Sequence, residues 1–138
     1  MILRDTEKKE VRIRMETVSD SEKMSYKYNG FFQIKNGKKY LMYSDGNEKC
    51  SVTSDGKIVR LSRFTTKSTM IFEKDSEHIS SYLTPMGSLP LCVATKTVSD
   101  KLCEDGTLFL KYNLSVGDTE PIENKIKITI EEIKNVSK

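Results

Sequence analysis

The sequence contains no tryptophan, one histidine, three cysteines and three prolines in 138 residues. No apolar run approaches the ~20 residues that a membrane-spanning helix requires. Hydrophobic residues make up 36% of the chain and charged residues 31%, and acidic and basic side chains are interspersed along it. This composition excludes a helical membrane protein and is typical of a soluble globular domain.

The scarcity of histidine and cysteine also limits the chemistry that the chain can support. A zinc site needs several His, Cys or acidic ligands, but neither an H-E-x-x-H motif nor paired C-x-x-C spacing occurs. His78 is the only histidine available as the base of a serine triad, and no G-x-S-x-G motif accompanies it. EF-hand, phosphate-loop and dinucleotide-binding patterns are absent as well. We therefore expect no metal, no cofactor and no catalysis.

The start of the chain and the cysteines indicate the compartment. Residues 1–3 are apolar, but charged residues follow from Arg4, whereas a secretory signal needs ~7–15 apolar residues in a row. Cys50, Cys92 and Cys103 cannot all pair, as expected for reduced thiols. The sequence therefore predicts a cytoplasmic protein with no membrane partner.

Turn-forming residues divide the chain at short intervals. Asn-Gly and Asp-Gly pairs at 36–37, 45–46, 55–56 and 105–106 favour two-residue hairpins, because both central residues of a type I′ turn need positive φ. Asn29-Gly30 interrupts an extended run and predicts a bulge or sharp bend. The expected strands form a meander over residues 10–18, 23–35, 38–44, 49–54, 57–63, 68–74, 78–84, 88–98, 107–116 and 124–132.

Hydrophobic periodicity supports strands over helices. Val11, Ile13 and Met15 alternate with charged residues, as do Ile126 and Ile128, and a period of two places each apolar set on one face. Only residues 99–104 fit a short helical turn. The chain is therefore expected to be all-β.

The amphipathic first and last strands favour closure into a barrel. Left as free edges, such strands would pair with other chains, and closure removes that hazard. Closure would also bring Arg12 or Arg14 near Glu131 or Glu132. We predict one domain over residues 1–138, a closed antiparallel meander barrel of about eight to ten strands, with a core of about 9–132 and frayed ends. A two-sheet sandwich is the alternative.

Three segments resemble the YwiB-like family of uncharacterised bacterial proteins. They are GKIVRLSRFTTKSTMIFEKDSEHISSYLTPMGSLPLCVATKTV, EDGTLFLKYNL and NKIKITIEE. The most specific piece is His78-x-Ser80-x-Tyr82-x-Thr84-Pro85-x-Gly87. Arg63 matches an arginine that precedes this piece, while Thr65 stands where the family pattern has glycine. The resemblance implies a calycin-like (lipocalin-like) β-barrel, but no chemistry, because fold alone does not confer activity.

The motif residues His78, Ser80, Tyr82 and Thr84 share one face of their strand. Facing outward, at the surface or rim, they would be solvated, and this orientation is slightly favoured. Facing inward, they would form a polar wall able to orient a small ligand. Bulky inward residues tend to fill a small barrel, so a cavity would be small and lie near Tyr43, Met70, Phe72 and Tyr82. The candidate ligand-binding residues are His78, Ser80, Tyr82, Thr84, Arg63 and Tyr43.

Two functions remain open on these grounds. The first is a small-molecule binding module whose ligand is unknown. The alternative is a protein- or RNA-interaction domain that uses its outer surface without catalysis. The net charge is +3 and the pI is near 8.7. Nucleic-acid binders typically have a pI above ~9, so nucleic acid is not the expected partner.

Overall fold

A computed structural model describes residues 7–64 and 67–133, except for the side chain of Tyr82. All regular secondary structure in this part consists of strands, which confirms the all-β prediction. The predicted strand bounds differ from the observed ones by three residues at most. The strands are β1 (Lys8–Ser19), β2 (Glu22–Lys35), β3 (Lys38–Asp45), β4 (Glu48–Ser54), β5 (Ile58–Arg63), β6 (Ser68–Glu73), β7 (Ser76–Thr84), β8 (Gly87–Lys101), β9 (Thr107–Val116) and β10 (Ile122–Glu132).

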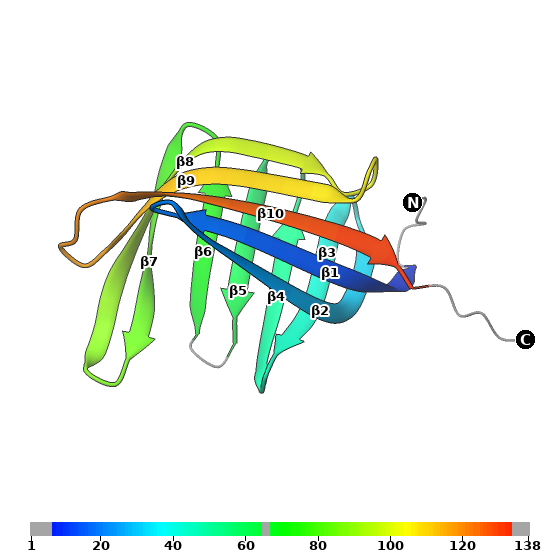
Figure 1. The fold of residues 1–138 in the computed structure, drawn as a ribbon, viewed down its shortest axis with the longest axis horizontal. Helices are drawn as coiled ribbons and strands as arrows, with labels where there is room; N and C mark the ends of the chain where they lie inside the picture. The colour runs from blue at the N-terminus through cyan, green and yellow to red at the C-terminus, as the bar shows by residue number, and fades with distance from the viewer. Residues whose placement is uncertain (1–6, 65–66, 134–138) are drawn as a thin grey trace, which may run out of the picture.

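The ten strands form one antiparallel meander in the order β6-β5-β4-β3-β2-β1-β10-β9-β8-β7. The first and last strands pair along their length, as the amphipathic pattern predicts, and Arg12 lies opposite Glu131. Their side chains form an exposed ion pair of 3.9 Å. Figure 1 shows β10, β1 and β2 at the front of a barrel whose rear wall contains β4 to β6.

Closure of the barrel is nearly complete. The ends of the sheet are β6 and β7, and within the described residues no ladder joins them. The turn between these strands explains the break: the backbone N–H of Asp75 donates to the carbonyl of Thr95 on β8 over 2.9 Å. This bond attaches the start of β7 to β8, and β6 and β7 diverge from there (Figure 1).

Side chains that alternate along the strands fill the interior. On β1, Val11, Ile13 and Met15 are buried while the charged residues between them face water. The pairing register aligns such rows from strand to strand, so that one continuous apolar core results. The largest fully buried side chains are Phe32, Phe72, Ile13, Leu41, Leu102, Leu108, Leu110 and Ile128.

One interior ion pair ties β8 to β3 and β4. The carboxylate of Asp100, which is 2% exposed, lies 3.0 Å from Nζ of Lys39 and accepts a hydrogen bond from the Ser54 hydroxyl. It also accepts one from the backbone N–H of Leu102, whose side chain is buried in the core. These contacts fix the loop between β8 and β9 against the barrel.

Several local predictions need correction. Of the bulge or sharp bend predicted at Asn29-Gly30, the bulge is absent, because no register shift occurs there. Glycine is required at this position because a Cβ would lie 2.2 Å from the Met42 carbonyl oxygen. Among the described residues, the one register shift in the ladders lies between Thr95 and Thr97. Asn36-Gly37 has positive φ at both residues, as predicted, and so do Asp20 and Ser21 between β1 and β2. At 45–46, 55–56 and 105–106 only the glycine has positive φ, so the prediction for these three pairs was wrong.

Two other expectations concern the chain segments beside and beyond the strands. β8 extends to Lys101, so the expected helical turn over 99–104 reduces to hydrogen bonds from Glu104 and Asp105 to the Lys101 carbonyl. The predicted fraying of the ends falls mostly on residues 1–6 and 134–138, and Thr65 falls in the gap at 65–66. All of these lie outside the described residues.

Candidate functional site

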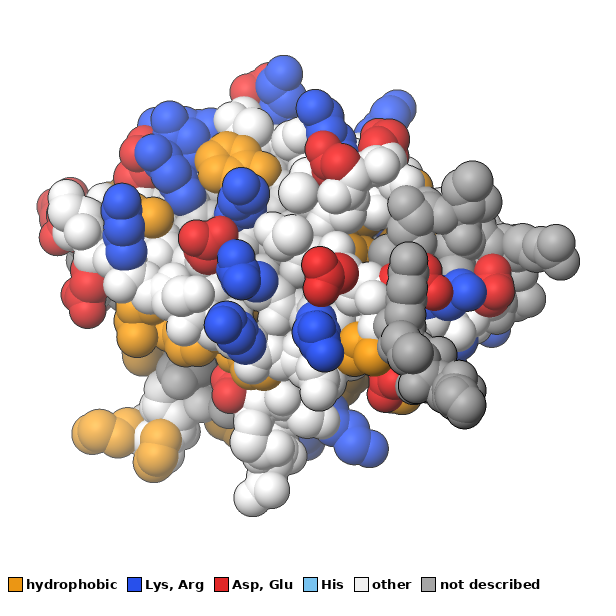
Figure 2. Space-filling model, turned by 45° about the vertical axis from the view of Figure 1, so that its right-hand side comes forward, with side chains coloured by type: hydrophobic (Ala, Val, Ile, Leu, Met, Phe, Trp, Pro, Cys, Tyr) orange, Lys and Arg blue, Asp and Glu red, His pale blue; other side chains and the backbone are white. Residues whose placement is uncertain are grey.

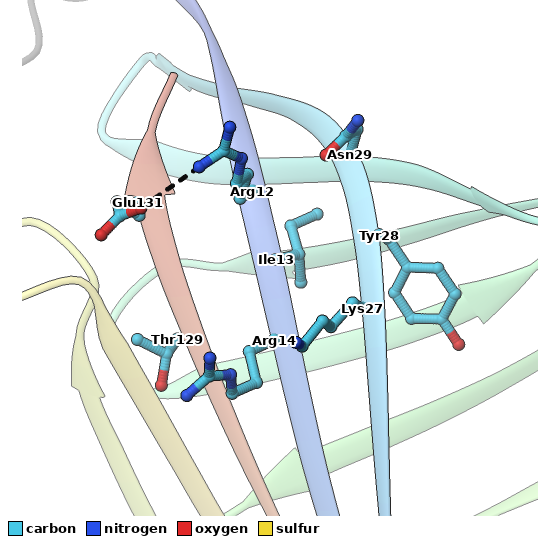
Figure 3. A pocket seen from close by; sticks show the side chains of 8 residues that line it. All are labelled: Arg12, Ile13, Arg14, Lys27, Tyr28, Asn29, Thr129 and Glu131. Carbon is cyan, nitrogen blue, oxygen red and sulfur yellow. Dashed lines mark ion pairs between the residues drawn. The ribbon is translucent and has the colours of Figure 1, made fainter. Parts of the chain in front are cut away.

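The outer face of β1 and its two neighbours carries a hollow. Arg12 and Arg14 point outward because Ile13 between them belongs to the core. The pairing register places Asn29 and Lys27 beside them on β2. The hollow has a volume of about 570 Å³ and is lined by Arg12, Ile13, Arg14, Lys27, Tyr28, Asn29, Thr129 and Glu131 (Figure 3).

A second hollow continues the first along the same strands. Glu16, Ser25 and Lys127 occupy the outward positions next to Arg14, Lys27 and Thr129. This hollow has a volume of about 370 Å³, and its lining is Glu16, Thr17, Val18, Lys23, Met24, Ser25, Phe109, Lys125 and Lys127. We refer to the two hollows together as the basic groove.

Positive charge dominates the basic groove. Its lining contains six basic side chains and two carboxylates, an excess of four positive charges, whereas the whole chain carries +3. The surplus charge of the protein is thus concentrated on this face. Figure 2 shows basic side chains spread over the visible surface, with carboxylates between them.

Two pairs of basic residues on this face lie directly opposite each other on adjacent strands, and a third pair, Lys35 and Lys38, flanks the turn between β2 and β3. Arg14 on β1 is opposite Lys27 on β2, and Lys125 on β10 is opposite Lys111 on β9. Among the described residues, none of these four side chains forms an ion pair. Like charges opposite each other destabilise a sheet by roughly as much as opposite charges stabilise it, about 0.2–1 kcal/mol. The groove therefore brings together more cations than its two carboxylates can neutralise.

A row of three tyrosines begins at the edge of this groove. The rings of Tyr26 and Tyr28 are stacked, with centroids 6.3 Å apart and planes 8° apart, and Tyr28 contacts Tyr43 at 4.7 Å. Tyr43 is buried and Tyr26 is 37% exposed. Burial raises the pKa of Tyr28 and, more strongly, that of Tyr43, so both stay neutral at physiological pH. The row thus presents an uncharged aromatic surface anchored in the core.

β2 has a free backbone edge beside these rings. β2 pairs with β1 from Glu22 to Gln33, but its pairing with β3 begins only at Gly30. Within the described residues, no strand pairs with the other edge of 22–29. The peptide groups and side chains of this segment are therefore accessible from the side away from β1.

The motif residues on β7 lie on the face of the strand that looks toward the core. His78 is opposite Val93 and Ser80 opposite Leu91, both buried, whereas Ile79 on the other face is 70% exposed. The row therefore faces inward rather than outward, but the side chains of His78, Ser80 and Thr84 are only partly buried, in keeping with the rim position that was slightly favoured. The Tyr82 side chain lies outside the described part, and its backbone pairs with Leu89.

The side chains of His78 and Thr84 make structural contacts at the two ends of this row. Nε2 of His78 lies 2.9 Å from a carboxylate oxygen of Glu73, so this contact bridges the seam between β6 and β7. The Thr84 hydroxyl donates to the carbonyl of Gly87 over 2.6 Å and closes the turn to β8. These contacts hold the ends of β7 in place.

The other two predicted residues, Arg63 and Tyr43, come together on the interior face. Nη1 of Arg63 donates to Glu48 over 2.9 Å, lies 3.4 Å from Asp45, and contacts the sulfur of Cys50, the neighbour of Tyr43 across β3 and β4. Burial lowers the pKa of Arg63, but the hydrogen bond to Glu48 and the surrounding groups outweigh it, so the pKa lies above its usual value. Because two carboxylates neutralise this guanidinium, it is a poor site for an anion.

Within the described part, no hydrogen bond or ion pair connects the Arg63 cluster to His78, Ser80 or Thr84. The five predicted residues whose side chains are described therefore form two separate groups. No cluster of three metal-ligating side chains occurs among the described residues, and no helix there is long and apolar enough to cross a membrane. Burial raises the pKa of the Cys50 thiol despite nearby Arg63, which disfavours the reactive thiolate.

The basic groove was missed as a site because acids interrupt its residues in the sequence. A signal was present: outward positions on strands repeat basic residues two or four apart, as in Arg12-x-Arg14, Lys23-x₃-Lys27 and Lys125-x-Lys127. Each segment alone is an ordinary solvated strand face. Only the order β2-β1-β10 places the three side by side.

Comparisons with known protein families, sequences and structures all point to the same family. Residues 9–128 match the family described as Domain of unknown function (DUF1934). The chain is 25% identical over 127 residues to the uncharacterized beta-barrel protein YwiB of Bacillus subtilis (strain 168), covering 88% of this chain and 89% of that protein. The crystal structure of the ywiB protein from Bacillus subtilis superposes with a TM-score of 0.70 at 18% identity, covering 88% of this chain and 92% of that chain. The fold and the family resemblance are thus confirmed, and the chain belongs to the DUF1934 family of β-barrel proteins.

Proposed function

We propose that this protein binds the phosphate backbone of a nucleic acid in the basic groove and catalyses no reaction on it. The observation that carries the proposal is the pairing of Arg14 with Lys27, two cations directly opposite each other in the larger hollow without a counter-ion. An anion bound between them would replace a repulsion by two attractions.

The geometry of the groove suits an extended anionic chain better than a compact ligand. Outward side chains on a strand are two residues apart, or about 6.6–6.8 Å. This spacing is similar to that between successive phosphates of an extended strand, so basic residues along β10, β1 and β2 can contact neighbouring phosphates. Long-range attraction by the same charges would speed association.

The interior supports this choice over the small-molecule hypothesis. Large apolar side chains such as Phe32, Phe72 and Leu110 occupy it, and the polar row on β7 lies at its rim. Both hollows of the basic groove are open to the outside. We also propose a cytoplasmic location, in keeping with three cysteines that are all free.

The test is a salt series of binding measurements. A fluorescein-labelled thymidine oligomer of about ten nucleotides, within the usual range of single-strand sites, is titrated with protein and followed by anisotropy. We expect the logarithm of the association constant to fall linearly with the logarithm of salt concentration. The double variant Arg14→Gln/Lys27→Gln should bind more weakly and lower this slope by about 1.4, since each contact to a single strand contributes about 0.7.

The matched control removes two charges elsewhere. Lys57→Gln/Arg60→Gln changes the net charge equally, but on the exposed turn before β5 and on β5 itself, in the rear wall. This variant should keep the parental slope. If the parent does not bind, or if both double variants lose the same affinity and slope, the groove is not a nucleic-acid site.

A further inference from the structure

We infer that the nucleic acid is single-stranded and that one of its bases stacks on Tyr26 at the free edge of β2. This inference rests on the proposed function and adds the strandedness and the residue that contacts a base. It starts from the tyrosine row rather than from charge.

The ring of Tyr26 is placed and supported as a stacking platform. One neighbour is the ring of Tyr28, nearly parallel to it, and Tyr28 in turn contacts the buried Tyr43. The Tyr26 hydroxyl donates to the sulfur of Met24 over 3.3 Å. Because these contacts fix the ring before binding, stacking costs little additional side-chain entropy.

The platform adjoins the basic groove across the edge of β2, because Tyr26 lies on the face of the strand opposite to Lys27 and itself lines neither hollow. Tyr28 lines the larger hollow together with Lys27, and Met24 lines the smaller one with Lys23. Figure 3 shows the Tyr28 ring on the side of β2 away from β1, while Arg14 and Arg12 lie on the other side. A single-stranded nucleic acid whose phosphates contact Lys27 and Lys23 can therefore place its bases over the edge of β2, toward Tyr26.

Access to the Tyr26 ring depends on where the pairing between β2 and β3 stops, at Gly30. Since no described strand pairs with 22–29 on this side, a base meets the ring without displacing a ladder. Bases in a duplex are already stacked and paired, whereas a single strand offers free ring faces. Aromatic stacking tolerates any base, so we expect little sequence preference.

The experiment separates stacking from charge by comparing two probes. The labelled thymidine oligomer carries phosphates and bases, and an abasic oligomer of the same length carries phosphates alone. In the parent protein, we expect the thymidine oligomer to bind about tenfold more tightly, in line with one stacked base. Tyr26→Leu should lose this advantage and leave abasic binding unchanged, and Tyr26→Phe should retain it because the ring remains.

The outcomes distinguish this inference from the proposed function. If both probes bind equally and Tyr26→Leu has no effect, stacking is refuted while binding of phosphates in the groove stands. If Tyr26→Leu weakens the binding of a blunt duplex as much as that of the thymidine oligomer, the single-strand assignment is refuted. If no probe binds, the groove proposal fails as well. Thermal unfolding of each Tyr26 variant should match the parent, since the side chain is exposed.

Discussion

Arg14 and Lys27 lie directly opposite each other on the outer face of the barrel, one on β1 and one on β2, and neither forms an ion pair within the described part of the chain. Adjacent to them, the pair Arg12 and Glu131 shows the arrangement that a sheet ordinarily favours. The two pairs line the same hollow, so the repulsive pair Arg14 and Lys27 lies beside the attractive pair Arg12 and Glu131.

Replacing Lys27 by glutamate should make the protein more stable and less able to bind nucleic acid. The change converts a cross-strand repulsion into an attraction, which corresponds to a gain of about 0.5–1 kcal/mol in unfolding free energy. Urea denaturation measures the gain. The same replacement at Lys57, on an exposed turn, should change stability by less than ~0.5 kcal/mol. A loss of stability in Lys27→Glu would show that the repulsion has no energetic effect.

Gly30→Ala should destabilise the barrel by about 1–3 kcal/mol or more. An added Cβ would lie 2.2 Å from the carbonyl oxygen of Met42 and 2.9 Å from Cδ1 of Ile13, and neither the β2–β3 ladder nor the core can yield easily. Thermal or urea unfolding provides the measurement. Ser25→Ala, on the exposed half of the same strand, serves as control and should have little effect. Equal stability of Gly30→Ala and the parent would contradict the close packing of β2 on β3.

Asp100→Asn should lower the unfolding free energy by about 3 kcal/mol. The carboxylate is buried and neutralises Lys39, so its loss leaves a largely buried ammonium group without a partner. The exposed pair of Lys96 and Glu123 provides the comparison, because Glu123→Gln should cost less than ~1 kcal/mol. Urea denaturation at neutral pH distinguishes the two. Similar losses in both variants would mean that burial adds nothing to the Asp100 contact.

Stability should fall at alkaline pH because of buried tyrosines. Burial raises the pKa of Tyr112 from 10.0 to about 12. Between these values the unfolded chain releases a proton that the folded chain keeps, so the stabilisation present below pH 10 is lost as the pH rises to about 12. The slope is about 1.4 kcal/mol per pH unit for each such group. In Tyr112→Phe the decline measured by urea denaturation should be shallower, and an unchanged decline would contradict the assignment.

Local signals in the sequence were sufficient for most of the fold. Asn36-Gly37 predicts a tight turn because both residues accept positive φ, and the alternation of Val11, Ile13 and Met15 fixes which face of β1 is buried. The role of Gly30 could not be predicted in this way. Its requirement arises from the Met42 carbonyl on β3, and only the assembled barrel reveals that contact.

The candidate site was less predictable because it depends on register. Arg14 and Lys27 are separated by a turn, and their opposition follows from the Asp20-Ser21 turn and not from any motif. The motif His78 to Thr84 drew attention to β7 instead, where mixed faces concealed the orientation. His78 proved to contact Glu73 at the seam, a relationship set by how β6 and β7 diverge.

The position of the seam also determines how the chain must assemble. Every pairing in the sheet joins strands that are consecutive in sequence, except that of β1 with β10. Residues 8–73 and 76–116 can each form a local meander, but the ring stays in two pieces until the last strand inserts between β1 and β9. Because that step joins the two ends of the chain, we expect it to limit the folding rate. Insertion of β10 is thus the step that completes the barrel, although the gap that remains in the wall lies between β6 and β7.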